Sequence, residues 1–174
     1  MRIEVGDRFR RDLNGLRAVA VLSVLCFHFG IAPFRGGFIG VDVFFVISGY
    51  LMTRILASQI EDGRLDIFRF YFGRMLRIVP ALLVTIVATL AITSVLLLPA
   101  QFLVAAREAI HSALFTVNIY FAGNTSYFAP AAAQSWFLHC WSLAVEIQFY
   151  LLIPLFLMAS HWISPRRGLA RFAI

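Results

Sequence analysis

The chain has 174 residues, of which 61% are hydrophobic and only 14% are charged, and its mean hydropathy is +0.85. This composition excludes an ordinary water-soluble domain. The net charge of +6 comes from arginine without any lysine, and in a soluble protein it would suggest nucleic acid binding. Long runs of Leu, Val, Ile and Phe instead make membrane lipid the first expected partner, with no expectation of nucleic acid.

Four stretches have the length of a membrane-crossing helix, roughly 20 residues of apolar character. The first lies too far from the N-terminus to be a cleaved signal peptide, so it is expected to stay in the mature protein. Only the third stretch contains no charged residue. In chain order, the predicted spans are about 13–32, 37–56, 78–98 and 136–162.

A fifth apolar stretch, about 102–121, holds Arg107, Glu108 and His111 and is interpreted as an additional outer-face or re-entrant helix. The fold class that follows is all-α: a polytopic transmembrane helix bundle of about four spans. Residues 1–174 are expected to form a single membrane domain. Cys26 and Cys140 both lie in apolar stretches, which favours buried thiols over a disulfide framework.

The distribution of arginine predicts the orientation, because cytoplasmic loops retain basic residues. With the N-terminus inside, the outer side receives only Arg35 and Arg107, and Arg17 lies within the first span. The N-terminus is therefore predicted to be cytoplasmic. The cytoplasmic side receives Arg2, Arg8, Arg10, Arg11, Arg54, Arg64, Arg69, Arg74, Arg77, Arg166, Arg167 and Arg171.

Arg17 and His28 are the first pair of ionisable residues within a span. Their separation corresponds to about 1100° of helix, three turns plus roughly 20°, so they share one face at different depths. Buried charges in spans are costly and mark functional sites, which favours a polar path through the membrane. The alternative is that Arg17 snorkels to lipid phosphate and His28 is an interfacial histidine satisfied by a neighbour.

Asp42 follows three glycines, Gly36, Gly37 and Gly40, which permit close approach of the backbone to a neighbouring helix. Its depth is expected to match that of His28. A carboxylate beside the imidazole would fix the tautomer and raise the basicity that a general base for a sugar hydroxyl needs. The alternative is an aspartate that caps the start of the helix.

Arg74 and Arg77 are neighbours on a helix face and are expected at the cytoplasmic surface. Such a guanidinium pair can bind the phosphates of a coenzyme or of lipid head groups. Glu146 is expected near the bilayer midplane, on one face with His139, and its expected partners are Arg17, His28 or a substrate. Structural pairing with Arg17 is the alternative.

Four ordered stretches resemble the acyltransferase-3 family, which includes bacterial O-antigen and other surface-polysaccharide O-acetyltransferases. They are LNGLRAVAVLSVLCFH, GGFIGVDVFFVISGY, FGRMLRIVP and LHCWSLAVEIQFY. Any one would be weak, because apolar segments match one another cheaply, but the charged positions agree in all four. One departure is Ile147, where many members carry a second carboxylate.

The resemblance implies transfer of an acyl group, usually acetyl, from cytoplasmic acyl-CoA to a hydroxyl of an extracytoplasmic glycan such as O-antigen lipopolysaccharide. It implies a multi-pass protein of the bacterial inner membrane, with acyl-CoA as donor substrate and neither a bound cofactor nor a metal. His28 is then the general base or acyl relay and Glu146 tunes the bundle interior. The family's catalytic positions fall on Arg17, His28, Asp42 and Glu146, and its donor-binding positions on Arg74, Arg77 and Arg17.

The family's membrane domain has more helices than the spans predicted here, so the chain is expected to be an N-terminal portion that needs further membrane helices or a second subunit. Two alternatives stay open. A truncated non-catalytic relative would keep the motifs without the activity. A small proton-coupled transporter subunit would explain intramembrane Arg, His and Glu, but not four motifs in order.

Overall fold

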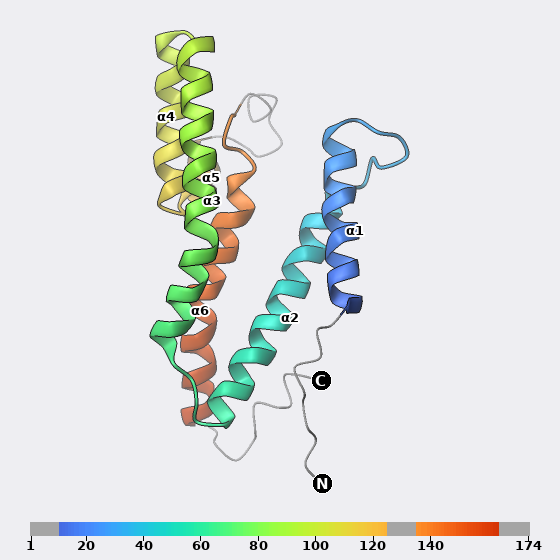
Figure 1. The fold of residues 1–174 in the computed structure, drawn as a ribbon, viewed down its shortest axis with the longest axis vertical. Helices are drawn as coiled ribbons and strands as arrows, with labels where there is room; N and C mark the ends of the chain where they lie inside the picture. Colours follow the sequence, from blue (N-terminus) through green and yellow to red (C-terminus); the bar gives the residue numbers. More distant parts are fainter. Residues whose placement is uncertain (1–10, 125–134, 164–174) are drawn as a thin grey trace. The chain divides into compact units, whose positions relative to one another are not determined.

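The computed structural model describes residues 11–124 and 135–163, which form six α-helices and no strand. The predicted all-α class is confirmed for this part of the chain (Figure 1). Six of the arginines used to predict the orientation, in 1–10 and 164–174, lie outside it. The helices are α1 (Arg11–His28), α2 (Ile39–Glu61), α3 (Ile67–Leu96), α4 (Pro99–Ala113), α5 (Val117–Asn124) and α6 (Cys140–Ile163).

Two compact units meet within α2, the first ending at Ile55 and the second beginning at Leu56. In the first unit, α1 and the start of α2 pack through glycine. A Cβ placed on Gly37 would come 2.1 Å from the Ser23 carbonyl oxygen, and one on Gly40 would come 2.3 Å from the Ala20 carbonyl oxygen. Only glycine fits at these two positions, which confirms the predicted close approach.

Helix α3 lies wholly in the second unit and is longer than its predicted span. Asp66 caps it by accepting a hydrogen bond of 2.9 Å from the backbone N–H of Arg69. The helix then continues through Pro80 to Leu96, 30 residues in all. At 1.5 Å per residue this is about 45 Å, well beyond the hydrocarbon core of roughly 30 Å. The segment 67–77, with its arginines, is therefore part of the same helix as the apolar span.

The predicted single helix at 102–121 is two helices in the structure. Phe115, at φ 54°, adopts the left-handed conformation between α4 and α5. Thr116 then donates its N–H to the His111 carbonyl oxygen at 2.8 Å, and its hydroxyl lies 3.0 Å from His111 Nδ1. The turn therefore satisfies backbone groups at the C-terminus of α4.

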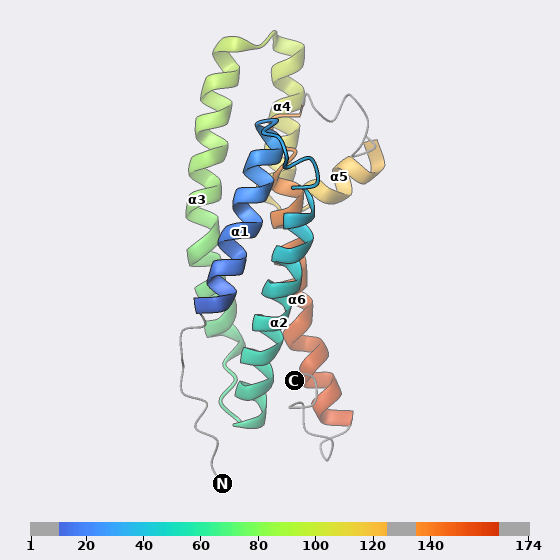
Figure 2. The same ribbon diagram turned by 90° about the vertical axis from the view of Figure 1, so that its right-hand side faces the viewer.

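Two of the apolar clusters among the described residues of the second unit hold α3, α4, α5 and α6 together. Figures 1 and 2 show α3 and α4 side by side, with α5 turning away from them. One cluster joins α3, α4 and the approach to α6; the other joins α5 and α6. Their buried members are Leu82, Ile86, Ala109 and Phe137 in the first, and Val117, Phe121 and Ala144 in the second.

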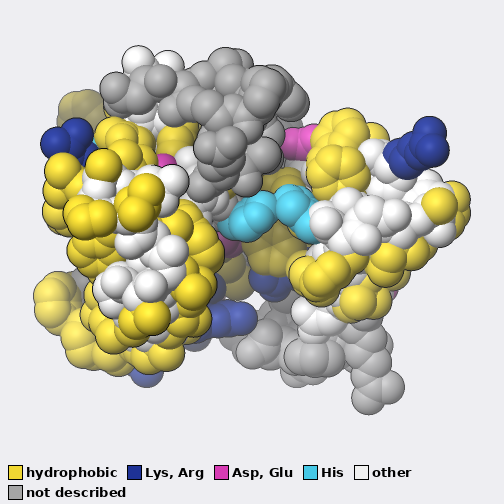
Figure 3. Space-filling model, turned by 90° about the horizontal axis from the view of Figure 1, so that it is seen from above, with side chains coloured by type: hydrophobic (Ala, Val, Ile, Leu, Met, Phe, Trp, Pro, Cys, Tyr) yellow, Lys and Arg dark blue, Asp and Glu magenta, His cyan; other side chains and the backbone are white. Residues whose placement is uncertain are grey.

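Three helices among the described residues, α2, α3 and α6, are long and apolar enough to cross a membrane. Helix α1 covers most of the first predicted span in sequence, but its 18 residues include Arg11, Asp12 and Arg17. That α1 crosses the membrane therefore stays a prediction. Large apolar side chains are exposed along all three candidates, and many of the side chains visible in Figure 3 are hydrophobic. A chain that leaves this much apolar surface uncovered is embedded in a membrane.

Candidate functional site

Arg17 points from α1 onto α2. Its guanidinium carbon lies 4.7 Å from the centroid of the Phe44 ring, a cation–π contact within the first unit. Helix α1 is continuous from Arg11 to His28. Arg17 and His28 therefore belong to one unbroken helix, as the prediction of a shared face requires. Arg17 is half-buried, with its guanidinium over the Phe44 ring.

His28 is the last residue of α1, and a backbone carbonyl orients its ring. Its Nδ1 lies 2.8 Å from the Val24 carbonyl oxygen, and the ring meets Phe27 edge-on at 5.3 Å. A carbonyl oxygen only accepts, so Nδ1 carries the proton and Nε2 is the basic nitrogen. The side chain is exposed. This tautomer is the one a general base uses to take a proton through Nε2.

Asp42 does not lie at the depth predicted for it. Gly40 is level with Ala20 and Val24, and Phe44 is level with Arg17, which brings Asp42 level with about Ala20. That is eight residues, or about 12 Å along α1, from His28. The prediction of equal depth is wrong because the 29–38 connection folds back along α1 before α2 begins. Asp42 lies in the first turn of α2, where a negative charge is favoured.

In the second unit, Glu146 and Arg74 are linked through one residue. Tyr150 donates its hydroxyl to Glu146 Oε1, one turn earlier on α6. The face of the same Tyr150 ring lies 5.6 Å from the guanidinium carbon of Arg74 on α3. The structure therefore brings together a predicted catalytic residue and a predicted donor-binding residue, with the tyrosine ring between them.

Arg74 lies level with the middle of α6, and its place at the cytoplasmic surface stays a prediction. Tyr150, which it contacts, is the eleventh residue of the 24-residue α6. Tyr71 confirms this level by donating its hydroxyl to the Leu151 carbonyl oxygen at 2.9 Å. Arg74 is thus about 20 Å from the end of α6, because unbroken α3 packs antiparallel along it. Arg77, one turn further along α3, is exposed.

Glu108 is a buried carboxylate for which the sequence predicted no role. It is only 4% exposed, and its Oε1 accepts a hydrogen bond of 2.8 Å from the Ser135 hydroxyl. Its Oε2 accepts one of 3.4 Å from the backbone N–H of Phe137. The carboxylate thereby fixes the segment that leads into α6, close to the positive end of that helix. His139 lies in this segment, one residue before α6 begins.

A family model described as "Acyltransferase domain", that of the acyltransferase-3 family, matches residues 10–174. The chain belongs to the acyltransferase-3 family. The peptidoglycan O-acetyltransferase OatA of Listeria monocytogenes is 39% identical over 166 residues, which are 94% of this chain and 26% of that protein. The O-acetyltransferase OatA of Staphylococcus aureus strain NCTC 8325 is 38% identical over 162 residues, 91% of this chain and 26% of that protein.

This acyltransferase-3 chain therefore spans about a quarter of the length of these curated relatives. No solved structure matches it. The match runs over all four stretches on which the resemblance was based, from the Arg17 region to the α6 region.

Two polar features of this acyltransferase-3 chain were not predicted, although both involve residues near the end of the fourth motif. Tyr150 ends the fourth motif, and Gln148 precedes it by two residues. Gln148 and Asn118 exchange side-chain hydrogen bonds of 2.9 and 3.0 Å, and Gln148 Nε2 also donates to the Phe115 carbonyl oxygen at 2.9 Å. Uncharged polar residues in an apolar helix need such partners. A glutamine in the apolar sequence of α6 therefore indicates a contact with another polar group.

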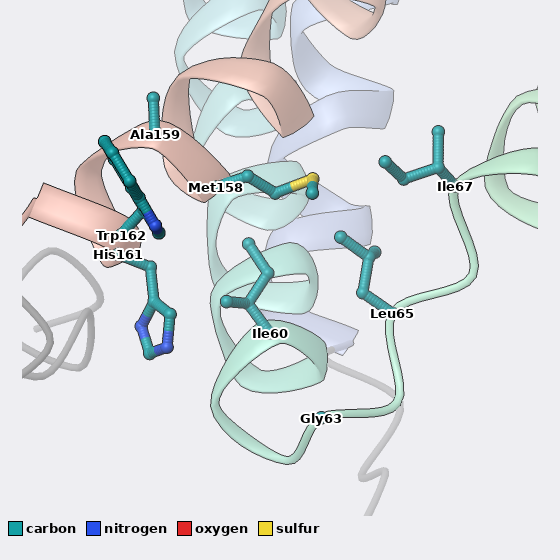
Figure 4. Close-up of a pocket in the computed structure, with 8 residues that line it drawn as sticks. All are labelled: Ile60, Gly63, Leu65, Ile67, Met158, Ala159, His161 and Trp162. Atoms are coloured by element: carbon teal, nitrogen blue, oxygen red, sulfur yellow. The ribbon is translucent and has the colours of Figure 1, made fainter.

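A cavity of about 560 Å³ opens at another place in the second unit, where the end of α2, the start of α3 and the end of α6 meet. Figure 4 shows side chains of all three segments around it, with His161 the only ionisable one among those drawn. None of the predicted site residues lines it. The lining consists of Ile60, Gly63, Leu65, Ile67, Met158, Ala159, His161 and Trp162.

Proposed function

We propose that the chain forms part of a membrane O-acyltransferase that moves an acyl group, acetyl in the first instance, from acyl-CoA to a hydroxyl of an extracytoplasmic glycan. The observation that carries the proposal is the 39% identity with a peptidoglycan O-acetyltransferase over 94% of the chain. A peptidoglycan-type glycan is accordingly the first acceptor to test, ahead of O-antigen.

His28 is the general base in this proposal. Its Nε2 takes the proton of the glycan hydroxyl while the hydroxyl oxygen attacks the carbonyl carbon of the acyl donor. With acyl-CoA as donor, the thioester C–S bond breaks, an ester C–O bond forms, and the proton finally leaves on the CoA thiol. The hydrogen bond from Nδ1 to Val24 supports this role, because it keeps the ring in the tautomer with a basic Nε2.

The donor is proposed to bind through arginine. Arg74 and Arg77 carry fixed positive charge one helical turn apart, and guanidinium groups pair with phosphate through parallel hydrogen bonds. Glu146 supports Arg74 through Tyr150. Arg17, stacked on Phe44 and on the same helix as His28, is proposed to orient the acyl donor.

The protein is proposed to lie in the bacterial inner membrane with its N-terminus in the cytoplasm. The support is the uneven distribution of arginine between the two sides of the predicted spans. With this orientation His28, at the far end of α1 from the N-terminus, faces the extracytoplasmic side, where the glycan acceptor is.

The test is glycan acetylation in a host strain. Cell-wall glycan is prepared from wild-type, deletion and complemented strains, and O-acetyl groups are measured by mass spectrometry before and after mild base treatment. The proposal predicts O-acetyl groups that disappear in the deletion strain and return on complementation. Isotope from labelled acetyl-CoA added to the cytoplasmic side of membrane vesicles should appear in the same product.

An unchanged acetylation pattern in the deletion strain would overturn the proposal. So would proton flux through vesicles that needs no acyl donor, combined with absence of acetyl transfer, because that result favours a transporter. Insertion of the protein is verified in each preparation by immunodetection in washed membranes.

A further inference from the structure

Arg74 lies between two aromatic rings of different helices. Its guanidinium carbon is 5.6 Å from the centroid of Phe70, one turn earlier on α3, and 5.6 Å from the centroid of Tyr150 on α6. Both distances fall within the range of a cation–π contact. The Tyr150 ring itself is buried, at 6% exposure, so its position is fixed by packing.

The hydroxyl of Tyr150 faces a carboxylate. It donates to Glu146 Oε1, so the negative charge and the guanidinium lie on opposite parts of one phenol. Donation of a hydrogen bond to an anion increases electron density in the phenol ring, which strengthens the attraction of its face for a cation. Glu146 therefore stabilises Arg74 through the ring.

This arrangement differs from a salt bridge because it leaves the N–H donors of the guanidinium available to a ligand. Among the described residues, no ion pair joins Arg74 to a carboxylate. A bidentate salt bridge would engage two N–H donors of the guanidinium with a carboxylate, whereas ring contacts leave the N–H donors in the guanidinium plane. The charge is thus stabilised at mid-depth of α6 without occupying the groups that bind phosphate.

We propose that Phe70 and Tyr150 form an aromatic clamp that positions the Arg74 guanidinium to bind a phosphate group of the acyl donor, and that Glu146 supports the clamp through Tyr150. This inference rests on the proposed function, because it takes acyl-CoA as the donor. Tyr150 and Phe70 are positioning residues: they act on the donor through Arg74.

The test separates donor affinity from turnover. The full protein is produced in membranes, and KM for acetyl-CoA and kcat are measured for wild type, Tyr150→Phe and Tyr150→Leu. Loss of the ring in Tyr150→Leu should raise KM for acetyl-CoA about 5- to 30-fold, the range expected for a partly desolvated cation–π contact, and change kcat less than about threefold. Tyr150→Phe keeps the ring, so its KM should rise by no more than about fivefold.

A matched control lies one residue away from the clamp. Tyr71 also bridges α3 and α6 through its hydroxyl, at 2.9 Å from the Leu151 carbonyl oxygen. Tyr71→Phe removes that interhelical hydrogen bond, as Tyr150→Phe removes the bond to Glu146, but leaves both rings of the clamp in place. Its KM for acetyl-CoA should stay within about twofold of wild type, well below that of Tyr150→Leu.

A second comparison guards against misfolding of Tyr150→Leu. Phe70→Leu removes the other ring, from a residue on α3 rather than α6, and should raise the same KM at unchanged membrane insertion. Equal KM values for wild type, Tyr150→Leu and Phe70→Leu would overturn the clamp. So would a fall in kcat alone. If wild type itself transfers no acetyl group, the proposed function fails, and that result is distinct from either clamp outcome.

Discussion

Gly40 of α2 lies so close to Ala20 of α1 that a Cβ on the glycine would come 2.3 Å from the alanine carbonyl oxygen. The obstacle is backbone, which cannot rotate away as a side chain can. Gly40→Ala should therefore push the two helices apart and destabilise the first unit by about 1–3 kcal/mol, the usual range for overpacking. Thermal unfolding of the detergent-solubilised protein measures the loss.

Gly15→Ala is the matched control, since nothing lies within 4 Å of a Cβ at that position in α1. Alanine should leave stability unchanged or raise it by up to about 1 kcal/mol, because it is the better helix former. Equal melting temperatures for the Gly40 and Gly15 variants would show that the close packing of α1 on α2 is absent in the membrane protein.

Arg17 should not be replaceable by lysine. Its planar guanidinium stacks on Phe44, and an ammonium group keeps the charge but not the stacking. Arg17→Lys and Phe44→Leu are both expected to lower acetyl transfer about tenfold, corresponding to about 1.4 kcal/mol. Initial rates with labelled acetyl-CoA give the result. Val46→Ala, at an exposed position of α2, should keep the wild-type rate, and full activity of Arg17→Lys would refute the stacking argument.

Glu108 is expected to matter for its acceptor oxygens more than for its charge. Glu108→Leu leaves the N–H of Phe137 and the hydroxyl of Ser135 without their acceptor and should cost about 2–4 kcal/mol of unfolding free energy. Glu108→Gln can accept from the N–H and donate to the hydroxyl, so its cost should be about 1 kcal/mol. Denaturant titration in mixed micelles compares the two.

Arg107, the exposed neighbour of Glu108 on α4, supplies the control. Arg107→Leu should change the unfolding free energy by no more than about 0.5 kcal/mol. If Glu108→Gln proved as destabilising as Glu108→Leu, the carboxylate charge rather than hydrogen bonding would hold the approach to α6.

Gln148 and Asn118 are expected to be coupled in stability. Gln148→Leu deprives both Asn118 and the Phe115 carbonyl of a partner and should cost about 2–3 kcal/mol. The double variant with Asn118→Leu should cost less than the sum of the single variants, by at least about 1 kcal/mol, because both polar groups of the pair are then gone. Additive costs in the double-mutant cycle would exclude the reciprocal hydrogen bonds.

The sequence predicted an all-helical chain with charged residues inside apolar stretches, because both features follow from the long apolar runs. It did not predict their depths. Asp42 lies about 12 Å from the level of His28 because the 29–38 connection folds back along α1, and no local pattern encodes that register. Arg74 lies level with the middle of α6, because α3 continues through Pro80 as one helix and packs against α6.

The break between α4 and α5 could not be predicted from the sequence either. Phe115 takes a positive φ that glycine normally supplies, and no glycine or proline marks the turn. Glu108 was recognised as a charge in an apolar stretch, but its function as an acceptor depends on residues 135–137, which reach it only in the folded chain. These features depend on contacts between segments that are distant in sequence, and local helix propensity carries no information about such contacts.

The assignment of His28 as general base is tested most directly by acetyl transfer from labelled acetyl-CoA to glycan in membranes that contain wild-type protein, His28→Ala or the control His161→Ala at equal amounts. The account predicts a loss of at least about 100-fold for His28→Ala, the lower range for removal of a general base, and the wild-type rate for His161→Ala. Transfer by His28→Ala at the wild-type rate would contradict it.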